Sequence, residues 1–426
     1  MRNRIIEKSK FNMIVMSVFC FCAVWGSGAI YIAFTGFLLS PVRIMLILLV
    51  AAGLISGTKI VISVETKKVY LFWFLLLVYA GLSVFWVADQ EKWINGMIYL
   101  IIGFLIMVLF LGFSGILNIM RYYRVVTGIM LAVSSIWGWY EMQTGNYLFV
   151  INARFLKMYS FVEKRAPVFA FGNTNNLALF ITFALLLLFP MLFDESKLKK
   201  LTYIGLAVLS FPILLMTDSR ANVIGLIIGI AVHMGFKMKR RITKAQTVLL
   251  FMALSAVILF FVLFWDNISN SLYEFFYFTG QKSSESISNI SRTNSLKNAF
   301  LMIINSLGFG VGCGNSSAAA NHVYNTLGVY DLHNWWLLIL TEYGAVFGIA
   351  YYAVYFSQVK KLFKFIREEE NDDYKQTMIS FAAIDIAFVL CLLSPSSVVA
   401  IEWLWVYWGI RFSWINRYSL CLYNVE

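Results

Sequence analysis

One short sequence combines residue types that can do acid–base chemistry. His333 and Asn334 stand where a polar segment meets a long apolar one, and Asp331 is expected to cap the helix that starts there. Both residues would then lie in the first turn of that helix. A neutral imidazole in this position can act as a general base, although a single histidine is more often structural.

A second short sequence, Thr217-Asp218-Ser219-Arg220-Ala221, precedes another apolar segment. Asp218 or Ser219 can cap the following helix, which places Arg220 in its first turn. A positive charge is unfavourable beside the free N–H groups of a helix N-terminus unless an anion is bound there. Arginine together with a helix N-terminus is a phosphate-binding arrangement. An ion pair between Arg220 and Asp218 is the alternative explanation, and this sequence alone does not decide between them.

The composition places these sequences in a membrane protein. Of the 426 residues, 60% are hydrophobic and only 13% are charged. A soluble domain has about 25% charged residues, so this chain lacks the polar surface that soluble domains need. Disordered, collagen-like and small disulfide-rich proteins are excluded by the same composition. The expected fold class is an all-α polytopic membrane protein.

Twelve apolar segments predict about twelve transmembrane helices, because a span needs roughly 20 mostly apolar residues. They are residues 11–42, 44–58, 69–88, 93–120, 125–140, 166–193, 201–217, 221–236, 245–265, 332–359, 376–393 and 398–410. We expect one integral membrane domain in three consecutive parts. These are a nine-helix region (1–265), an extracytoplasmic loop with short helices between helices 9 and 10 (266–332), and three C-terminal helices (333–426).

Lysine and arginine predict the orientation, because short cytoplasmic loops carry an excess of them. With both termini in the cytoplasm, most of the 34 lysines and arginines fall on the cytoplasmic side. Topology then explains much of the net charge of +12, and no nucleic-acid binding is inferred. The outer side carries unusual basic residues that run against this trend, among them Arg154, Arg165, Arg220 and Arg292. Since the two long connections also lie outside, we expect any chemistry to face outward.

The long outer connection contains two further features. Residues 291–300, which include Arg292, are typical of the start of a short amphipathic helix. The glycines of Gly308-Phe309-Gly310-Val311-Gly312 match neither the dinucleotide-binding nor the P-loop pattern. They favour close approach of the backbone and tight turning instead.

The other polar residues near apolar segments have structural explanations. His233 is expected at the cytoplasmic interface and His322 in a polar loop, while Glu342 would be partly solvated near the outer surface. Ionisable residues within spans are candidates for function, but Asp385 and Glu402 are expected only to join helices. The five cysteines show no metal-binding spacing, and no metal or other cofactor is expected.

Four motifs, taken in order, resemble the bacterial O-antigen ligase and O-antigen polymerase superfamily. They are Phe171-Gly172-Asn173-Thr174-Asn175-Asn176-Leu177-Ala178; Thr217-Asp218-Ser219-Arg220-Ala221; Arg292 followed by the glycine-rich sequence and Asn315; and Leu332-His333-Asn334 with Glu342-Tyr343-Gly344 and Gly348. The largest outer loop of the superfamily also falls between its Ser-Arg turn and its His-Asn helix. The motifs cover residues 167–352.

The resemblance implies a GT-C-like fold and an inverting, metal-independent glycosyltransferase in the bacterial cytoplasmic (inner) membrane, with its active site facing outside. The donor would be a glycan on undecaprenyl pyrophosphate. Arg220 and Arg292 would bind the pyrophosphate and stabilise the leaving group, and His333 would deprotonate or orient the acceptor hydroxyl. The further substrate-binding candidates are Arg165, with Arg154 as its alternative, Asn175, Asn176, Ser219, Asn334 and Glu342.

The acceptor distinguishes two activities within the superfamily. A polymerase joins lipid-linked repeat units, whereas a ligase transfers the glycan to a lipid A–core sugar. Abundant Ile, Lys, Asn and Phe suggest AT-rich coding and a Gram-positive source without lipid A, which favours an O-antigen- or capsule-type polymerase. The expected partners are the bilayer and the lipid-linked oligosaccharide, with a chain-length regulator and a flippase as further candidates.

Two other classes of protein are weighed against the enzyme. A twelve-helix transporter or flippase often shows internal repeats, but the long loop divides this chain nine helices to three. A non-catalytic assembly scaffold would tolerate the loss of both Arg220 and His333.

Overall fold

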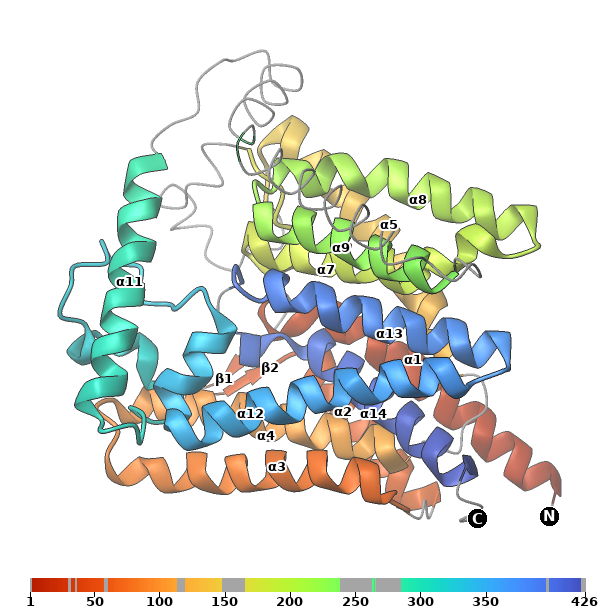
Figure 1. Ribbon diagram of the computed structural model, residues 1–426, viewed down its shortest axis with the longest axis horizontal. Coiled ribbons are helices and arrows are strands. Elements are labelled where there is room, and N and C mark those ends of the chain that lie inside the picture. Colours follow the sequence, from red (N-terminus) through yellow and green to blue (C-terminus); the bar gives the residue numbers. More distant parts are fainter. Residues whose placement is uncertain are drawn as a thin grey trace, which may run out of the picture. The chain divides into compact units, whose positions relative to one another are not determined.

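The computed structural model describes residues 2–29, 32–34, 37–56, 60–112, 119–147, 165–237, 263, 265, 285–395 and 398–422. These residues are predominantly helical, so the predicted all-α class is confirmed (Figure 1). A small exception is the hairpin of β1 (Ile32–Phe34) and β2 (Phe37–Leu39), which pair antiparallel with Ala33 opposite Leu38.

Seven helices among the described residues are long and apolar enough to cross a membrane. They are Val64–Phe85, Gln90–Gly112, Thr174–Phe193, Lys197–Met216, Arg220–Lys237, Trp335–Glu368 and Asp372–Cys391. The chain is therefore a polytopic integral membrane protein. The predicted ninth segment, 245–265, lies outside the described residues except at 263 and 265. The total of twelve spans and the cytoplasmic position of both termini stay predictions.

The helices belong to two compact units, each built from separate parts of the chain. Unit 1 comprises residues 1–130, 286–355 and 396–426, and unit 2 comprises residues 131–285 and 356–395. Helices α5 (Ile119–Thr144) and α12 (Trp335–Glu368) each contribute several turns to both units. The domain boundaries predicted after residues 265 and 332 stay predictions.

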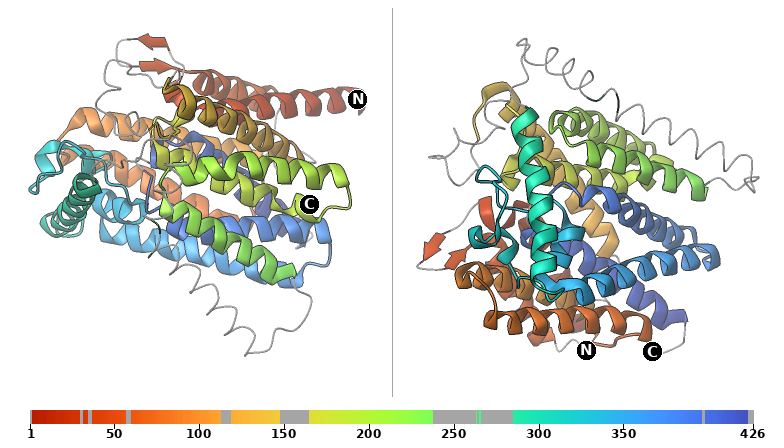
Figure 2. Two further views of the ribbon diagram at one scale, coloured as in Figure 1. Left: turned by 90° about the horizontal axis from the view of Figure 1, so that it is seen from above. Right: turned by 60° about the vertical axis from the view of Figure 1, so that its left-hand side comes forward.

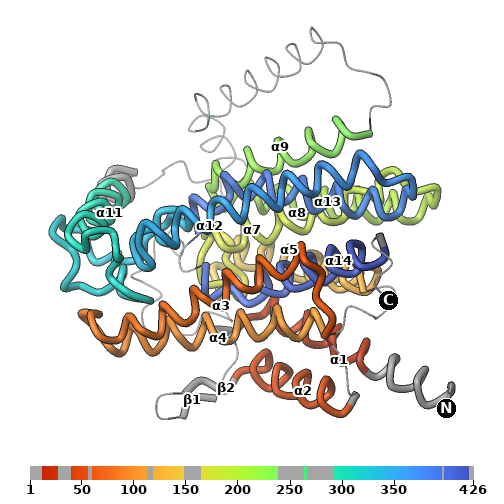
Figure 3. Tube along the Cα trace, turned by 60° about the horizontal axis from the view of Figure 1, so that its bottom comes forward, coloured from red at the N-terminus to blue at the C-terminus, as the bar shows by residue number. Residues whose placement is uncertain are grey.

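Unit 1 contains most of the N-terminal helices and the C-terminal one. Its elements are α1 (Arg2–Ala29), α2 (Pro41–Ser56), α3 (Val64–Leu82), the 3-10 helix η1 (Ser83–Phe85), α4 (Gln90–Gly112), α11 (Glu285–Asn305), the 3-10 helices η5 (Asn315–Ser317), η6 (Ala319–Asn321) and η7 (Val398–Ala400), and α14 (Glu402–Leu422). Helices α1 and α2 pair with each other, and α4 runs along both α3 and α14 (Figure 3).

Aromatic rings and a glycine pack the core of unit 1. The indole of Trp405 lies 5.0 Å from that of Trp73 on α3 and 5.1 Å from that of Trp408, centroid to centroid. On α4, a Cβ added to Gly103 would overlap the Trp405 ring. Helices in membranes often approach closely at small residues, and Gly103 makes room for the indole in this way.

Unit 2 is a group of helices centred on α9. It contains the 3-10 helices η3 (Phe169–Phe171) and η4 (Phe189–Phe193), with α7 (Thr174–Leu188), α8 (Lys197–Met216), α9 (Arg220–Lys237) and α13 (Asp372–Cys391). Helix α9 packs against α7 and α13 (Figures 1 and 2). Gly225 of α9 faces Cys391 of α13, and Gly229 faces Leu186 of α7.

His233 is held inside unit 2. Its side chain is buried, and a ring nitrogen lies 3.1 Å from the Leu186 carbonyl oxygen, so the imidazole forms a hydrogen bond between α9 and α7. Its expected place near the cytoplasmic interface stays a prediction. His233 is therefore a structural residue.

Two predicted spans also have different boundaries. The uncharged run 11–42 does not form one helix, because α1 ends at Ala29 and α2 begins at Pro41, where proline is favourable as a first helical residue. The predicted segment 398–410 ends before the charged residue Arg411, whereas α14 continues past Arg411 to Leu422. Glu402 consequently lies in the first turn of α14, where the helix dipole favours a carboxylate.

A glycine substitution tests the packing of unit 1. Gly103→Ala should destabilise the protein by roughly 1–3 kcal/mol, because the new methyl group would overlap the Trp405 indole. The measurement is the thermal unfolding midpoint of the purified protein in detergent. Gly205→Ala on α8 is the matched control, since no atom lies within 4 Å of its added Cβ, and it should leave the midpoint unchanged or raise it. Equal midpoints for the two variants would contradict this packing.

Candidate functional site

Helix α12 is interrupted at Gly344, whose φ of 79° and ψ of 175° are not helical. Close to this break, the helix uses its backbone to bind another segment. The carbonyl of Thr341 accepts the N–H of Val311 at 2.9 Å, and the carbonyl of Glu342 accepts the N–H of Gly312 at 3.0 Å. The glycine loop, defined here as residues 308–317, is thus hydrogen-bonded to the broken helix.

Only glycine fits at the contact between the glycine loop and α12. Gly310 has a φ of 83°, and a Cβ added to it would lie 2.5 Å from both the Glu342 carbonyl oxygen and the Gly344 nitrogen. Gly344 has a positive φ as well, and its added Cβ would overlap the Gly308 carbonyl oxygen. The close backbone approach predicted from the glycine spacing is confirmed.

The carboxylate of Glu342 binds the same loop with both oxygens. Oε1 accepts the hydroxyl of Ser316 at 2.6 Å, and Oε2 accepts the N–H of Gly314 at 3.0 Å. The Glu342 side chain is only 4% exposed, so the expected partial solvation was wrong. Because both oxygens already have donors within the protein, Glu342 is placed to hold the loop in position.

The opposite side of the glycine loop is attached to the connection between α3 and α4. Asn315 forms two hydrogen bonds with the backbone of Asp89, accepting its N–H at 2.8 Å and donating to its carbonyl at 3.0 Å. The N–H of Cys313 donates to Ser83 Oγ at 3.2 Å, and the indole N–H of Trp86 donates to the Gly310 carbonyl at 3.0 Å. The glycine loop is therefore fixed from two sides.

Cys313 is buried inside this arrangement. Burial raises the pKa of its thiol to about 12, and the negative charge of Glu342 adds to the rise. The thiol stays protonated at neutral pH and is a poor nucleophile. Within the described ranges, no group of three or more His, Cys, Asp or Glu side chains is arranged to hold a metal ion.

His333 and Asn334 lie immediately before α12, which begins at Trp335. The side-chain oxygen of Asn334 accepts the N–H of Leu337 at 3.1 Å, so Asn334 caps the helix. The predicted cap at Asp331 was wrong, and His333 precedes the helix instead of lying in its first turn. The imidazole of His333 is half-buried.

Arg292 lies on α11, and the predicted amphipathic helix is confirmed and is longer than expected. The buried face of α11 carries Ser291, Ser295, Asn298, Ala299 and Met302, at helical spacing. Arg292 lies next to this face and is exposed. The face is bound to the loop before α12, since Ser291 Oγ donates to the Thr326 carbonyl at 3.0 Å.

Arg220 is the first residue of α9 and is exposed. The preceding Asp218 has a φ of 59°, and its carboxylate accepts the indole N–H of Trp265 at 2.6 Å. The guanidinium carbon of Arg220 lies 5.8 Å from the centroid of the same indole, within the range of a cation–π contact. One tryptophan therefore contacts both charged side chains of the turn.

The hydroxyl of Ser219 is occupied by side chains. It accepts the amide N–H of Asn222 at 2.8 Å and lies 3.2 Å from the hydroxyl of Ser394, which in turn is 3.1 Å from Asn222 Nδ2. Ser219 is only 2% exposed. These bonds fasten the start of α9 to the end of α13, and neither Asn222 nor Ser394 was predicted from the sequence.

Arg165 and the asparagines at positions 173, 175 and 176 lie before α7 or in its first turn. Asn173 caps α7 by accepting the N–H of Asn175 at 2.8 Å. Asn175 is buried, and the buried Oδ1 of Asn176 makes no hydrogen bond within the part of the chain that is described. Arg165 is exposed with a φ of 48°, while its alternative, Arg154, lies outside the described residues.

One further buried residue, not predicted from the sequence, binds the backbone just before α7. Glu141, at the end of α5, is fully buried and accepts the N–H of Val168 at 2.8 Å and the N–H of Phe169 at 2.9 Å with one carboxylate oxygen. Phe169 has a φ of 50°, so the backbone turns sharply at the point that Glu141 binds. The acidic side chain thus stabilises the turn that leads into α7.

The predicted site residues are divided between the two units. Unit 1 contains Arg292, His333, Asn334 and Glu342, and unit 2 contains Arg165, Asn175, Asn176, Ser219 and Arg220. Within each unit, several of these side chains form hydrogen bonds that stabilise the segment around an exposed or half-buried candidate site residue. A single catalytic site formed by all of them stays a prediction.

Two comparisons show what the chain is similar to. The model of the O-antigen ligase family matches residues 205–353, a range that includes Arg220, Arg292 and His333. The chain is also similar to the teichuronic acid biosynthesis protein TuaE of Bacillus subtilis (strain 168). The two are 25% identical over 362 residues, which cover 83% of this chain and 72% of the relative.

These matches confirm the resemblance that the motifs indicated, and they support placing the chain in the O-antigen ligase and polymerase superfamily. Its members are glycosyltransferase-like polymerases and ligases of polysaccharide biosynthesis. They act on lipid-linked polysaccharide substrates in a membrane. The chain is accordingly an integral membrane protein that is similar to this group.

Two substitutions of Glu342 test its role in holding the glycine loop. Glu342→Ala leaves the buried N–H of Gly314 and the hydroxyl of Ser316 without an acceptor, which should cost roughly 1–3 kcal/mol for each unsatisfied group. Glu342→Gln should remain close to the parent, because its oxygen can accept from Gly314 while its amide donates to the Ser316 hydroxyl. Thermal unfolding in detergent measures both variants. An Ala variant as stable as the Gln variant would contradict the role.

Proposed function

We propose that the protein is an inverting, metal-independent glycosyltransferase that polymerises repeat units carried on undecaprenyl pyrophosphate, at the outer face of the bacterial cytoplasmic membrane. The observation that carries this proposal is the exposed guanidinium of Arg220 at the first position of α9. The N-terminus of a helix and an arginine together attract a phosphate group.

The surroundings of Arg220 also fit an anion ligand. The Asp218 carboxylate accepts a hydrogen bond from Trp265, and the indole also lies beside the guanidinium. The Ser219 hydroxyl is bound to the side chains of Asn222 and Ser394. The first turn of α9 therefore presents an arginine at the positive end of the helix dipole, which favours a bound pyrophosphate.

In the proposed reaction, an acceptor hydroxyl oxygen attacks the anomeric carbon of the donor sugar and forms the new glycosidic bond. The bond from that carbon to the pyrophosphate oxygen breaks, and undecaprenyl pyrophosphate leaves with the bonding electron pair. His333 takes up the hydroxyl proton. Arg220 and Arg292 stabilise the negative charge on the leaving group, and direct displacement inverts the anomeric centre.

A polymerase is favoured over a ligase by two observations. The composition, rich in Ile, Lys, Asn and Phe, fits a source without lipid A. The matched relative is named for teichuronic acid biosynthesis, a name that fits polymer synthesis better than transfer to a lipid A–core sugar. A chain-length regulator and a flippase are proposed as partners on the same reasoning.

Loss of His333 or Arg220 should abolish transfer without removing the protein. His333→Ala should lower the rate about 10²–10⁴-fold, as expected for a general base, and Arg220→Ala about 10²–10³-fold. Arg367→Ala, at the exposed end of α12, is the matched charge control and should keep the parent rate. If both site variants retained full activity at equal expression, the enzyme would not use this site.

The decisive assay supplies the purified protein with a defined undecaprenyl-pyrophosphate oligosaccharide in the absence of added metal. A ladder of longer lipid-linked products supports the polymerase. A single transfer to an added lipid A–core acceptor identifies a ligase instead. No transfer in either reaction, from protein that is folded by its unfolding midpoint, would reject the proposed function.

A further inference from the structure

A chain of hydrogen bonds runs from α11 to α12 through the outer loop. Asn298 on α11 donates its Nδ2–H to Nδ1 of His322 at 3.1 Å, and Nε2 of His322 lies 2.9 Å from the Ser316 carbonyl oxygen. The hydroxyl of Ser316 then donates to the Glu342 carboxylate on α12 at 2.6 Å. This Asn298–His322–Ser316–Glu342 chain is called the relay below.

The bonds of Asn298 settle which ring nitrogen of His322 carries the proton. Its Oδ1 accepts the backbone N–H groups of Val323 at 3.0 Å and Tyr324 at 2.8 Å, while Nδ2 also donates to the Tyr324 carbonyl at 2.9 Å. A rotated amide would lose all three bonds, so Nδ2 faces His322 as a donor. Nδ1 must therefore accept, and Nε2–H donates to the Ser316 carbonyl, which fixes a neutral tautomer.

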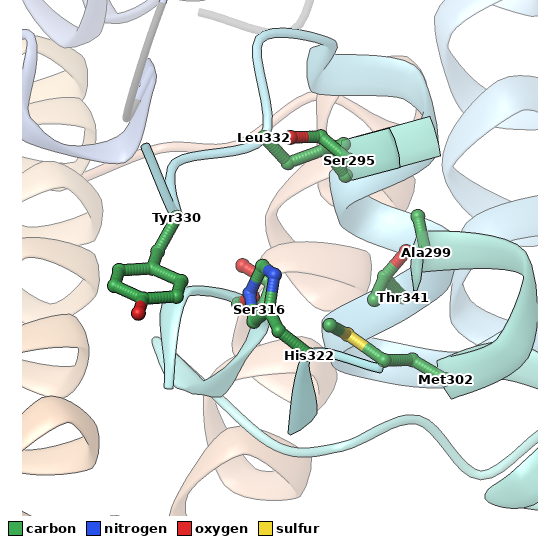
Figure 4. A pocket seen from close by; sticks show the side chains of 8 residues that line it. All are labelled: Ser295, Ala299, Met302, Ser316, His322, Tyr330, Leu332 and Thr341. Atoms are coloured by element: carbon green, nitrogen blue, oxygen red, sulfur yellow. The ribbon is translucent and has the colours of Figure 1, made fainter. Parts of the chain in front are cut away.

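The relay crosses the tightly packed interior between α11 and the loop before α12. A narrow cavity beside His322 shows which elements meet there (Figure 4). It is lined by Ser295, Ala299 and Met302 of α11, by Ser316, His322, Tyr330 and Leu332 of the loop, and by Thr341 of α12. The ring of Tyr330 also meets that of His322 edge to face, with centroids 4.9 Å apart.

We infer that the relay is a positioning device that holds α11 against the start of α12. It thereby sets the distance between Arg292 and His333, and it does so only while His322 is neutral. This inference rests on the proposed function, because Arg292 and His333 are the residues whose spacing matters for transfer. Asn298 lies on the same helix as Arg292, and His333 directly precedes the helix that carries Glu342. A small displacement of α11 would therefore separate the two catalytic candidates.

Protonation of His322 would break the relay. A second proton on Nδ1 would face the Nδ2–H donor of Asn298, and neither group could then accept. The charged or titratable groups of the surrounding elements are Lys297 on α11, whose ammonium lies 5.3 Å from the Tyr324 ring, Glu342 on α12, and Tyr324, Tyr330 and Asp331 in the loop. Loss of the neutral tautomer would therefore loosen the contact between α11 and the loop before α12.

NMR spectroscopy can determine the tautomer of His322 without an enzyme assay. The chain contains 3 histidines, so protein labelled with ¹⁵N-histidine in nanodiscs should give a small set of imidazole signals. His322→Gln identifies the signal of interest by its disappearance. At about pH 7.5 we expect the ¹⁵N shifts of a neutral Nε2–H imidazole. A charged ring or an Nδ1–H tautomer at that pH would overturn the relay.

A pair of α11 substitutions separates positioning from general destabilisation. Asn298→Ala should lower kcat about 10- to 100-fold because the catalytic residues shift relative to each other. Asn294→Ala is the matched control, since Asn294 on the same helix bonds the Asn325 carbonyl of the same loop but lies outside the relay, and it should keep kcat. Equal kcat values for both variants would reject the relay as a positioning device. If the parent transferred no glycan at all, the proposed function would fail, while the tautomer would still decide whether the relay exists.

Discussion

The interruption of α12 at Gly344 is the constraint on which the part of unit 1 around the glycine loop depends. Near the hydrocarbon region, backbone groups must find hydrogen-bond partners inside the protein, and an unbroken helix provides them along its own length. Where α12 breaks, its carbonyls accept N–H groups of the glycine loop instead. This pairing requires two backbones at very short range, which explains why glycine occupies position 310 as well as position 344.

Burial of the Glu342 carboxylate follows from the same contact. A carboxylate that leaves water needs hydrogen-bond donors, because an unsatisfied charge in the interior is very unfavourable. The glycine loop approaches α12 closely enough to supply the Gly314 N–H and the Ser316 hydroxyl. The loop and the acidic side chain thus stabilise each other. The connection between α11 and α12 is therefore an integral part of the packed structure over residues 308–317.

Local sequence features predicted the elements well. Apolar length placed most of the helices, the turn before Arg220 placed the start of α9, and helical spacing identified α11 around Arg292. Charge patterns were less reliable at helix ends, since Arg411 lies within α14 and Asn334, instead of Asp331, caps α12. In each case the helix end depends on a specific hydrogen bond or on the burial of a side chain. The average hydropathy of a sequence window reports neither.

Tertiary docking decided what the sequence left open. His322 and Asn298 are ordinary loop and surface residues by local pattern, and they become hydrogen-bond partners, with Asn298 buried and His322 half-buried, only when α11 packs on the loop before α12. Ser394 is separated from Ser219 by 175 positions and meets it only through the packing of α9 on α13. Glu141 likewise binds a turn that is 27 and 28 positions away. No periodicity within one segment could indicate these pairs.

The structure also divides the family-like motifs into two kinds of residue. Gly310 and Asn315 of the glycine loop and Glu342 of α12 are buried where these segments contact each other or the connection between α3 and α4. Any effect they have on a substrate must therefore be indirect. Arg220 and Arg292 are exposed, and His333 is half-buried just ahead of α12. A substrate with a pyrophosphate group and a sugar hydroxyl needs cations and a base that it can reach. Under the proposed function, the chemistry would therefore be concentrated in these three side chains, and the glycines, Asn315 and Glu342 would supply the rigid support that a transfer reaction requires.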